Sequence, residues 1–267
     1  MNRRAPRPSV GTPAARPNSL AAVRTVIAAY YTGKVEKFGA TPFGVDWTCV
    51  PTQELRFVQL LKLCDFTSPL SLNDLGCGYG ALISYLDRRH ADCSVDYLGI
   101  DLSQAMLRRA RRLWRNRANV SFAQGHIGPR IADYSVASGI FNVQQDQPHA
   151  VWEAFVAATL DELHRTSRRG FSVNFMKTPP RGATARAGVY AAEPERWTSH
   201  CTDALGARTQ IIQDYGLREF TLIVRRKRLL RIRRIAVRVL RVLRACDRRC
   251  NSHSQNNCQN LKNVFHH

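Results

Sequence analysis

Short apolar runs alternate with segments of helical periodicity along the middle of the chain. Apolar residues at 55, 57, 58, 60, 61 and 63 predict a helix over 51–64. The same reasoning predicts helices at 19–31, 104–114, 150–166 and 194–205. It predicts a strand with its exit loop at 120–126, and strands at 136–143, 170–176, 208–213 and 218–225. The turn Asp214-Tyr215-Gly216 joins the last two strands tightly, so these must be antiparallel. The pattern predicts an α/β fold whose mainly parallel sheet ends in an antiparallel hairpin.

Residues 71–102 combine a short buried strand, a glycine turn, a helix to Arg89 and a second strand that ends at Asp101. Three glycines at 76, 78 and 80 let the backbone turn tightly and approach a ligand closely. Asp101 falls where a parallel strand ends at the ligand-binding edge of such a sheet, and its carboxylate can accept both hydroxyls of a ribose. Because Gly76-x-Gly78-x-x-Ala81 also satisfies the dinucleotide fingerprint, the glycines alone leave the class of nucleotide open.

Asp74, two residues before the first glycine, distinguishes the two classes. Leu72-Asn73-Asp74-Leu75-Gly76-Cys77-Gly78-Tyr79-Gly80 resembles motif I of class I S-adenosylmethionine-dependent methyltransferases, and Gly99-Ile100-Asp101-Leu102-Ser103 resembles their motif II. Dinucleotide enzymes usually carry a small apolar residue at the position of Asp74, because an acid there would repel a pyrophosphate. S-adenosylmethionine has no phosphate and carries an ammonium and a sulfonium, which acids attract.

The resemblance implies a Rossmann-like methyltransferase fold, with a seven-stranded sheet and helices on both faces, and S-adenosylmethionine as cofactor. In that family the motif I acid orients the amino-acid end of the cofactor and the motif II acid binds the ribose. Gly125-His126 stand in the loop that meets the adenine, where the family often has an acid. The expected cofactor-binding residues are Asp74, Leu75, Gly76, Gly78, Gly80, Asp101, Leu102, Gly125, His126 and Phe141.

The methyl acceptor is expected between a leader and the loop that follows the fourth strand. The leader, residues 19–66, resembles the cap of small-molecule methyltransferases. Its candidates for the acceptor pocket are Tyr30, Tyr31, Phe38, Trp47 and Gln53. These side chains could equally serve only to pack the cap on the sheet. In the loop, Asn142 and Gln144 could bind substrate, and Asp146 or His149 could act as a base. Alternatively, Asp146 could be a turn residue and His149 a residue at the start of the next helix. Residues 177–192 are predicted to form a lid.

The net charge of +20 belongs mainly to the ends of the chain, because residues 25–224 hold 22 basic and 19 acidic residues. We expect a disordered basic arm at 1–18, a methyltransferase domain at 19–225 and a basic amphipathic tail, partly disordered, at 226–267. Residues 226–249 would form a cationic helix that contacts an anionic membrane surface or nucleic acid, or would be an extension without function. No run approaches the length of a membrane span, and the eight cysteines are read as reduced thiols of a cytoplasmic protein without a metal site.

Three functions agree with the sequence. The first is a methyltransferase that acts on a small-molecule acceptor by in-line methyl transfer. The second is an RNA or protein methyltransferase, favoured by five arginines between 108 and 115 and by the basic tail. The third is a non-catalytic protein of the same fold that uses its tail as a membrane or partner adaptor.

Overall fold

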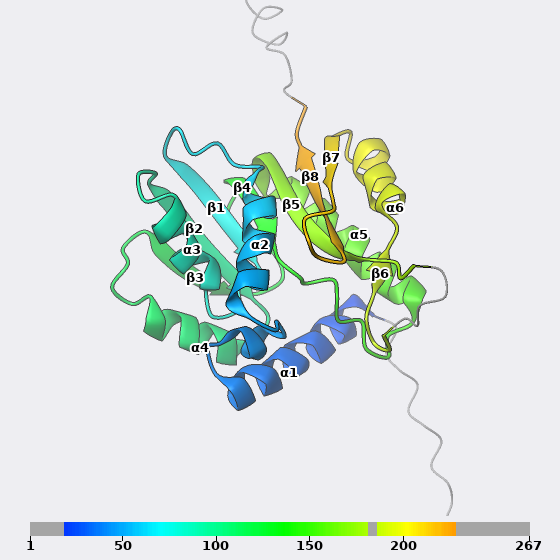
Figure 1. Ribbon diagram of the computed structural model, residues 1–267, viewed down its shortest axis with the longest axis horizontal. Helices are drawn as coiled ribbons and strands as arrows, with labels where there is room; N and C mark the ends of the chain where they lie inside the picture. Colours follow the sequence, from blue (N-terminus) through cyan, green and yellow to red (C-terminus); the bar gives the residue numbers. More distant parts are fainter. Residues whose placement is uncertain (1–18, 181–185, 228–267) are drawn as a thin grey trace, which may run out of the picture. The chain divides into compact units, whose positions relative to one another are not determined.

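The structure, a computed structural model, describes residues 19–180 and 186–227 (Figure 1). Its strands are β1 Leu70–Leu75, β2 Val95–Asp101, β3 Val120–Gln124, β4 Ala132–Ala137, β5 Ser167–Lys177, β6 Ala191–Ala192, β7 Arg208–Ile212 and β8 Glu219–Arg225. Its helices are α1 Leu20–Phe38, α2 Val50–Leu61, α3 Ala81–Arg89, α4 Gln104–Leu113, α5 His149–Arg165 and α6 Pro194–Ser199. A 3₁₀ helix, η1, spans Pro42–Val45, and a π-helix, η2, spans His200–Ala204.

The strands form one sheet in the order β3-β2-β1-β4-β5-β8-β7, with β6 paired to β5 (Figure 1). Neighbouring strands from β3 to β5 are parallel, whereas β8 is antiparallel to both β5 and β7. The predicted mainly parallel sheet with an antiparallel C-terminal hairpin is therefore confirmed. The two-residue strand β6, which pairs with β5 in parallel, is an addition to the seven strands that were predicted.

Apolar residues on the two faces of the sheet form two separate cores, so helices cover both faces as predicted. One core joins the sheet to α5 and α6 through Trp152, Phe155 and Trp197, all buried. The other joins it to α2 and α3 through Phe57, Leu60 and Leu82. Helix α1 instead packs against α4, α5 and η1, beside the sheet rather than on it (Figure 1).

Several predicted boundaries were wrong, among them those of the fourth strand and of the first helix. The fourth strand was expected at 136–143, but β4 ends at Ala137, because Gly139 adopts a left-handed backbone (φ 73°) and the chain turns away from the sheet. The first helix was expected to end at residue 31, but α1 continues to Phe38. It stops at Gly39, whose N–H donates to the Val35 carbonyl at 3.0 Å and whose positive φ of 70° glycine adopts readily.

Several predictions fall outside the described residues. These are the arm at 1–18, the tail beyond residue 227 and the centre of the expected lid, 181–185. The described part of the chain up to Arg226 forms one compact unit. No helix in the described ranges is long and apolar enough to cross a membrane. The cytoplasmic location that was expected from the cysteines stays a prediction.

Candidate functional site

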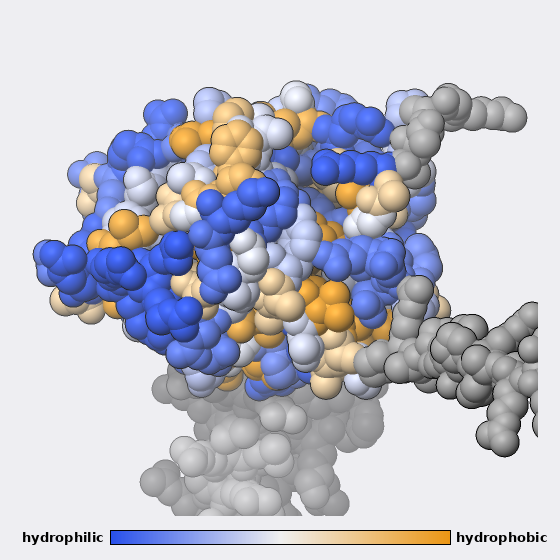
Figure 2. All heavy atoms as spheres, turned by 90° about the horizontal axis from the view of Figure 1, so that it is seen from below, coloured by the Kyte–Doolittle hydropathy of each residue, from blue (hydrophilic) through white to orange (hydrophobic). Residues whose placement is uncertain are grey.

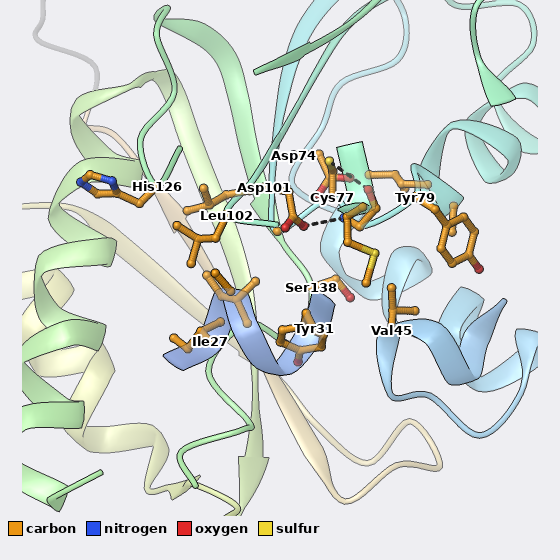
Figure 3. A pocket seen from close by; sticks show the side chains of 18 of the residues that line it. Ile27, Tyr31, Val45, Asp74, Cys77, Tyr79, Asp101, Leu102, His126 and Ser138 are labelled. Atoms are coloured by element: carbon orange, nitrogen blue, oxygen red, sulfur yellow. Dashed lines mark hydrogen bonds between the residues drawn. The ribbon is translucent and has the colours of Figure 1, made fainter. Parts of the chain in front are cut away.

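A cavity lies at the carboxyl ends of β1, β2 and β4, with about 970 Å³ of empty space including the part that opens to solvent. The sheet supplies one wall, α1 a second, and the segment from η1 into α2 a third. Figure 3 shows Asp101 in the middle, with His126 towards one end and Tyr79 towards the other. Eight of the ten predicted cofactor-binding residues line this cavity: Asp74, Leu75, Gly76, Gly78, Asp101, Leu102, Gly125 and His126.

The glycine turn and Asp101 hold each other in place through backbone hydrogen bonds (Figure 3). The Gly78 N–H donates to one carboxylate oxygen of Asp101 at 2.9 Å, and the Ser103 N–H donates to the other at 2.7 Å. Gly78 has a φ of 56°, and a Cβ there would lie 2.7 Å from the Val45 side chain. Only glycine therefore allows the turn to pass this close to both the acid and the cap.

Asp74 is the second acid of the cavity and is buried. Within the described residues its side-chain carboxylate accepts one hydrogen bond, which the Tyr97 hydroxyl donates at 2.6 Å. Burial raises the pKa of Asp74 to about 7, the Tyr97 hydrogen bond opposes this, and the negative charge of Asp101 adds to it. Burial also raises the pKa of Asp101 to about 6, although the backbone donors at Ser103 and Gly78 favour its ionised form. A cation placed near both acids would relieve this cost, so the cavity suits a positively charged ligand.

The other two predicted cofactor-binding residues do not line the cavity. A Cβ on Gly80 would face Trp114 and Ile83, and Phe141 is buried in the core, stacked on Phe175 with ring centroids 5.0 Å apart. Ser138 and Ile140, on the same loop as Phe141, line the cavity instead.

The candidates of the following loop also lie outside the cavity lining. The Gln144 amide donates to the Gln147 carbonyl at 2.7 Å, and the buried amide of Asn142 finds no hydrogen bond within the described ranges. The His149 ring lies 5.7 Å from the ring of Tyr190, centroid to centroid. Asp146, too, is absent from the lining.

The described part of the expected lid lies beside this loop. The Gln145 N–H donates to the Gly188 carbonyl at 2.8 Å, and the Tyr190 N–H donates to the Asn142 carbonyl at 2.9 Å. Residues 142–145 and 188–190 are thus joined by backbone hydrogen bonds.

Three of the five cap candidates, Tyr31, Trp47 and Gln53, line the cavity. The other two have structural contacts, because the Tyr30 hydroxyl donates to Asp46 at 2.7 Å and Phe38 packs on Phe43. Sequence reasoning missed Ile27, Val45, Ser138 and Ile140. A signal existed for Ile27, which precedes Tyr31 by one helical turn and so shares its face of α1.

Known proteins match this chain in sequence and in fold. Residues 73–170 match the family described as "Methyltransferase domain". A protein of Mycobacterium tuberculosis named as a methyltransferase, Rv1506c, is 42% identical over 166 residues, which span 62% of this chain and 99% of that protein.

Two solved structures share the fold. The magnesium protoporphyrin IX methyltransferase of Synechocystis PCC 6803, solved with bound S-adenosylhomocysteine, has a TM-score of 0.52 at 14% identity, over 76% of this chain and 100% of that one. The phosphoethanolamine N-methyltransferase 1 of Haemonchus contortus has a TM-score of 0.55 at 11% identity, over 79% of this chain and 50% of that one. Together with the match over nearly the whole length of the mycobacterial protein, these findings show that the chain belongs to the class I S-adenosylmethionine-dependent methyltransferases.

Proposed function

We propose that this methyltransferase acts on a small-molecule acceptor. The observation that carries the proposal is the position of α1 and η1. Helix α1 places Ile27 and Tyr31 across the cavity from the glycine turn, and η1 places Val45 against Gly78 of that turn (Figure 3). Helix α1 and the segment from η1 into α2 therefore form a roof over the carboxyl edge of the sheet. An acceptor must fit between this roof and the sheet. An RNA strand or a folded protein would need this edge to be open.

The residues present fit the family's cofactor. The two oxygens of Asp101 accept the Gly78 and Ser103 N–H groups, and the carboxylate, which has about four lone-pair sites, can still accept a ribose hydroxyl. Asp74 uses one oxygen for Tyr97, and its carboxylate can accept hydrogen bonds from the ammonium of the amino-acid end. We assign the adenine end to Leu102, Gly125 and His126, which line the cavity. Leu102 and His126 lie on the side of Asp101 that is away from Tyr79 (Figure 3).

When bound, S-adenosylmethionine supplies a methyl group that its sulfonium already activates for in-line displacement. The chain then has to align the acceptor and to exclude water, and alignment of two reactants can lower a barrier by about 7–11 kcal/mol. Tyr31 and Trp47 belong to the roof and Ser138 to the sheet side, so these walls would hold the acceptor. A general base is needed only for a neutral hydroxyl or a protonated amine. Asp146 and His149 stay predicted candidates for that role.

A second function, transfer to RNA or protein, is favoured by the exposed arginines of α4. Arg108, Arg111 and Arg112 are exposed on this helix, which packs against α1. Arg111 also donates to the Phe122 carbonyl at 3.2 Å, so part of this face has a structural role.

The experiment that tests the proposal has two steps. Calorimetric titration with S-adenosylmethionine first establishes cofactor binding, and its absence would leave only a non-catalytic adaptor. Incubation of the full chain with methyl-labelled cofactor and cell extract then shows where label accumulates. We expect label in the small-molecule fraction, and label confined to RNA or protein would contradict the proposal.

A further inference from the structure

The walls of the cavity around Trp47 carry a second conclusion, which rests on the proposed function. We propose that the acceptor is an uncharged, planar ring compound that packs against Trp47, with one polar group near Ser138. The proposal stands on the chemistry of the lining, on the way Trp47 is held, and on the pairing of the charges behind it.

The lining offers an acceptor apolar and aromatic surface. Its apolar and aromatic residues include Ile27, Tyr31, Val45, Trp47, Phe57 and Ile140, of which Val45 and Ile140 also pack on the glycine turn. Among the described lining residues no lysine or arginine occurs, and the acidic ones are Asp74 and Asp101, which we assign to the cofactor. Burial raises the pKa of Tyr31 and lowers that of His126, so both stay neutral near pH 7. A charged acceptor would lose its hydration without gaining an opposite charge, which is costly.

Trp47 is held rigidly on two sides. The Arg56 guanidinium lies 3.7 Å from the centroid of its ring, a cation–π contact. At its edge, a Cβ on Gly139 would lie 2.2 Å from the indole, so the ring packs directly on the Gly139 backbone. The indole therefore forms a fixed wall, and the part that remains free lines the cavity.

The same two contacts are connected through the protein interior. Arg56 donates from Nε and Nη2 to the Glu219 carboxylate at 2.5–3.0 Å, and the Asn174 amide donates to Glu219 at 2.7 Å. Asn174 in turn accepts the Gly139 N–H at 2.7 Å. Trp47, Arg56, Glu219, Asn174 and Gly139 thus form a closed ring of contacts, and this ring fixes the roof to the loop after β4.

Charges near the wall are paired with each other rather than with the cavity. Arg56 pairs with Glu219, and Lys34 pairs with Asp46 at 2.5 Å. Ser138 differs, because its Oγ is buried without a hydrogen-bond partner in the described ranges while the residue lines the cavity (Figure 3). A single uncharged donor or acceptor on the ring compound would satisfy this hydroxyl.

The test uses three probes with the same fused rings and different charges: 2-naphthol, 2-naphthoate and (2-naphthylmethyl)ammonium. Each is titrated by calorimetry into the full chain saturated with S-adenosylhomocysteine. We expect 2-naphthol to bind at least about tenfold more tightly than either charged probe. We expect Trp47→Ala to weaken 2-naphthol by about tenfold or more and Trp47→Phe to restore most of it. Phe43→Ala, an exposed aromatic in η1 outside the cavity lining, is the matched control and should bind 2-naphthol as the native chain does.

Two results would overturn the proposal: a charged probe that binds as tightly as 2-naphthol, or 2-naphthol binding that Trp47→Ala leaves unchanged. The comparison of the three probes on the native chain decides the question even if Trp47→Ala does not fold. If S-adenosylhomocysteine itself failed to bind, the proposed function would fail first. The probes titrated without it would still report separately on the cavity.

Discussion

Asp101 shows at the scale of one residue how the fold prepares a carboxylate for a ligand. Both oxygens accept backbone N–H groups from segments that the glycine turn and the start of α4 bring together. In Asp101→Asn, one of these N–H groups would face an amide NH₂ instead of an acceptor. The lost charge and the unpaired donors together predict about 10–100-fold weaker binding of S-adenosylhomocysteine.

Calorimetry measures this difference, and Asp96→Asn is the matched control. Asp96 lies on the same strand, but its side chain is 62% exposed and pairs with Arg130 on the surface. Its replacement should leave the affinity unchanged within about twofold. Equal affinities for Asp101→Asn and Asp96→Asn would show that the ribose contact was assigned to the wrong acid.

Asp74 makes the stability of the ligand-free protein depend on pH. Its pKa is raised from an ordinary value of 3.8 to about 7, so the folded state binds a proton that the unfolded chain releases. The stabilising contribution is complete below pH 3.8 and is lost as the pH rises through about 7. Because Asn carries no charge at any pH, Asp74→Asn should be more stable than the native protein at pH 8, by an amount on the order of 2–4 kcal/mol, and nearly equal to it at pH 4.

Urea unfolding of both proteins at pH 4 and pH 8 tests this prediction. Asp133→Asn is the control. Burial raises the pKa of the native Asp133 carboxyl, but hydrogen bonds from Ser71 and the charges of Arg169 and Arg168 together lower it below its ordinary value. That carboxyl stays ionised across the range, so the difference between this variant and the native protein should change little. An Asp74→Asn difference that is equally constant would contradict the raised pKa.

Whether a residue of the site was predictable depends on how far apart in the chain the segments that position it lie. Asp74 and Asp101 were predictable, because a short motif with a strand on either side fixes both. Val45 was not, because its place beside Gly78 depends on how η1 packs on the turn, which no local pattern encodes. Phe141 was expected at the cavity because the strand was extended too far; beyond Ala137 the chain turns, and Phe141 enters the core.

At the scale of the elements, the order of strands was predictable and the positions of their ends were not. Apolar runs and the turn at Asp214-Tyr215-Gly216 were sufficient to predict the parallel sheet with its antiparallel hairpin. Gly139 lies in an apolar run that continues the strand pattern, so the sequence pattern did not predict the turn there. Its conformation depends on contacts with Trp47 and Asn174, which are distant in the chain.

The Arg56–Glu219 pair joins α2 to β8 and has a predictable effect on stability. Both side chains are buried, and the carboxylate accepts three donor groups from Arg56 and Asn174. Glu219→Ala would leave the guanidinium buried without a partner and should lower the free energy of unfolding by about 3–5 kcal/mol.

Replacing both partners removes the unpaired charge as well as the pair. Arg56→Met combined with Glu219→Leu should therefore cost clearly less than Glu219→Ala alone. Urea unfolding of the native protein and the variants gives these differences. A double variant that is no more stable than the single one would mean that the pair itself, rather than the avoided unpaired charge, stabilises the junction.

At the scale of the whole molecule, most of the net positive charge lies outside the part of the chain that forms the cavity. Residues 25–224 are nearly balanced, with 22 basic and 19 acidic residues, whereas the chain as a whole carries +20. Figure 2 shows the side of α1 and α4, where the end that carries α4 is mainly hydrophilic. The cavity lies within the balanced part, and its lining residues in the described part of the chain fall between 27 and 159. Cofactor binding should therefore be independent of the basic tail.

Comparing the full chain with a chain ending at residue 227 tests this separation. We expect the same affinity for S-adenosylhomocysteine within about twofold, because none of the described residues beyond Thr159 lines the cavity and β8 ends at Arg225. The full chain should bind vesicles of the anionic lipid phosphatidylglycerol at low salt, and the truncated chain should not. Each basic residue near such a surface contributes about 1 kcal/mol to binding. Neutral phosphatidylcholine vesicles are the control. If the truncated chain still bound vesicles, the arginines of α4 rather than the tail would contact the anionic lipid. If truncation weakened S-adenosylhomocysteine binding, the tail would contribute to cofactor binding, contrary to the prediction.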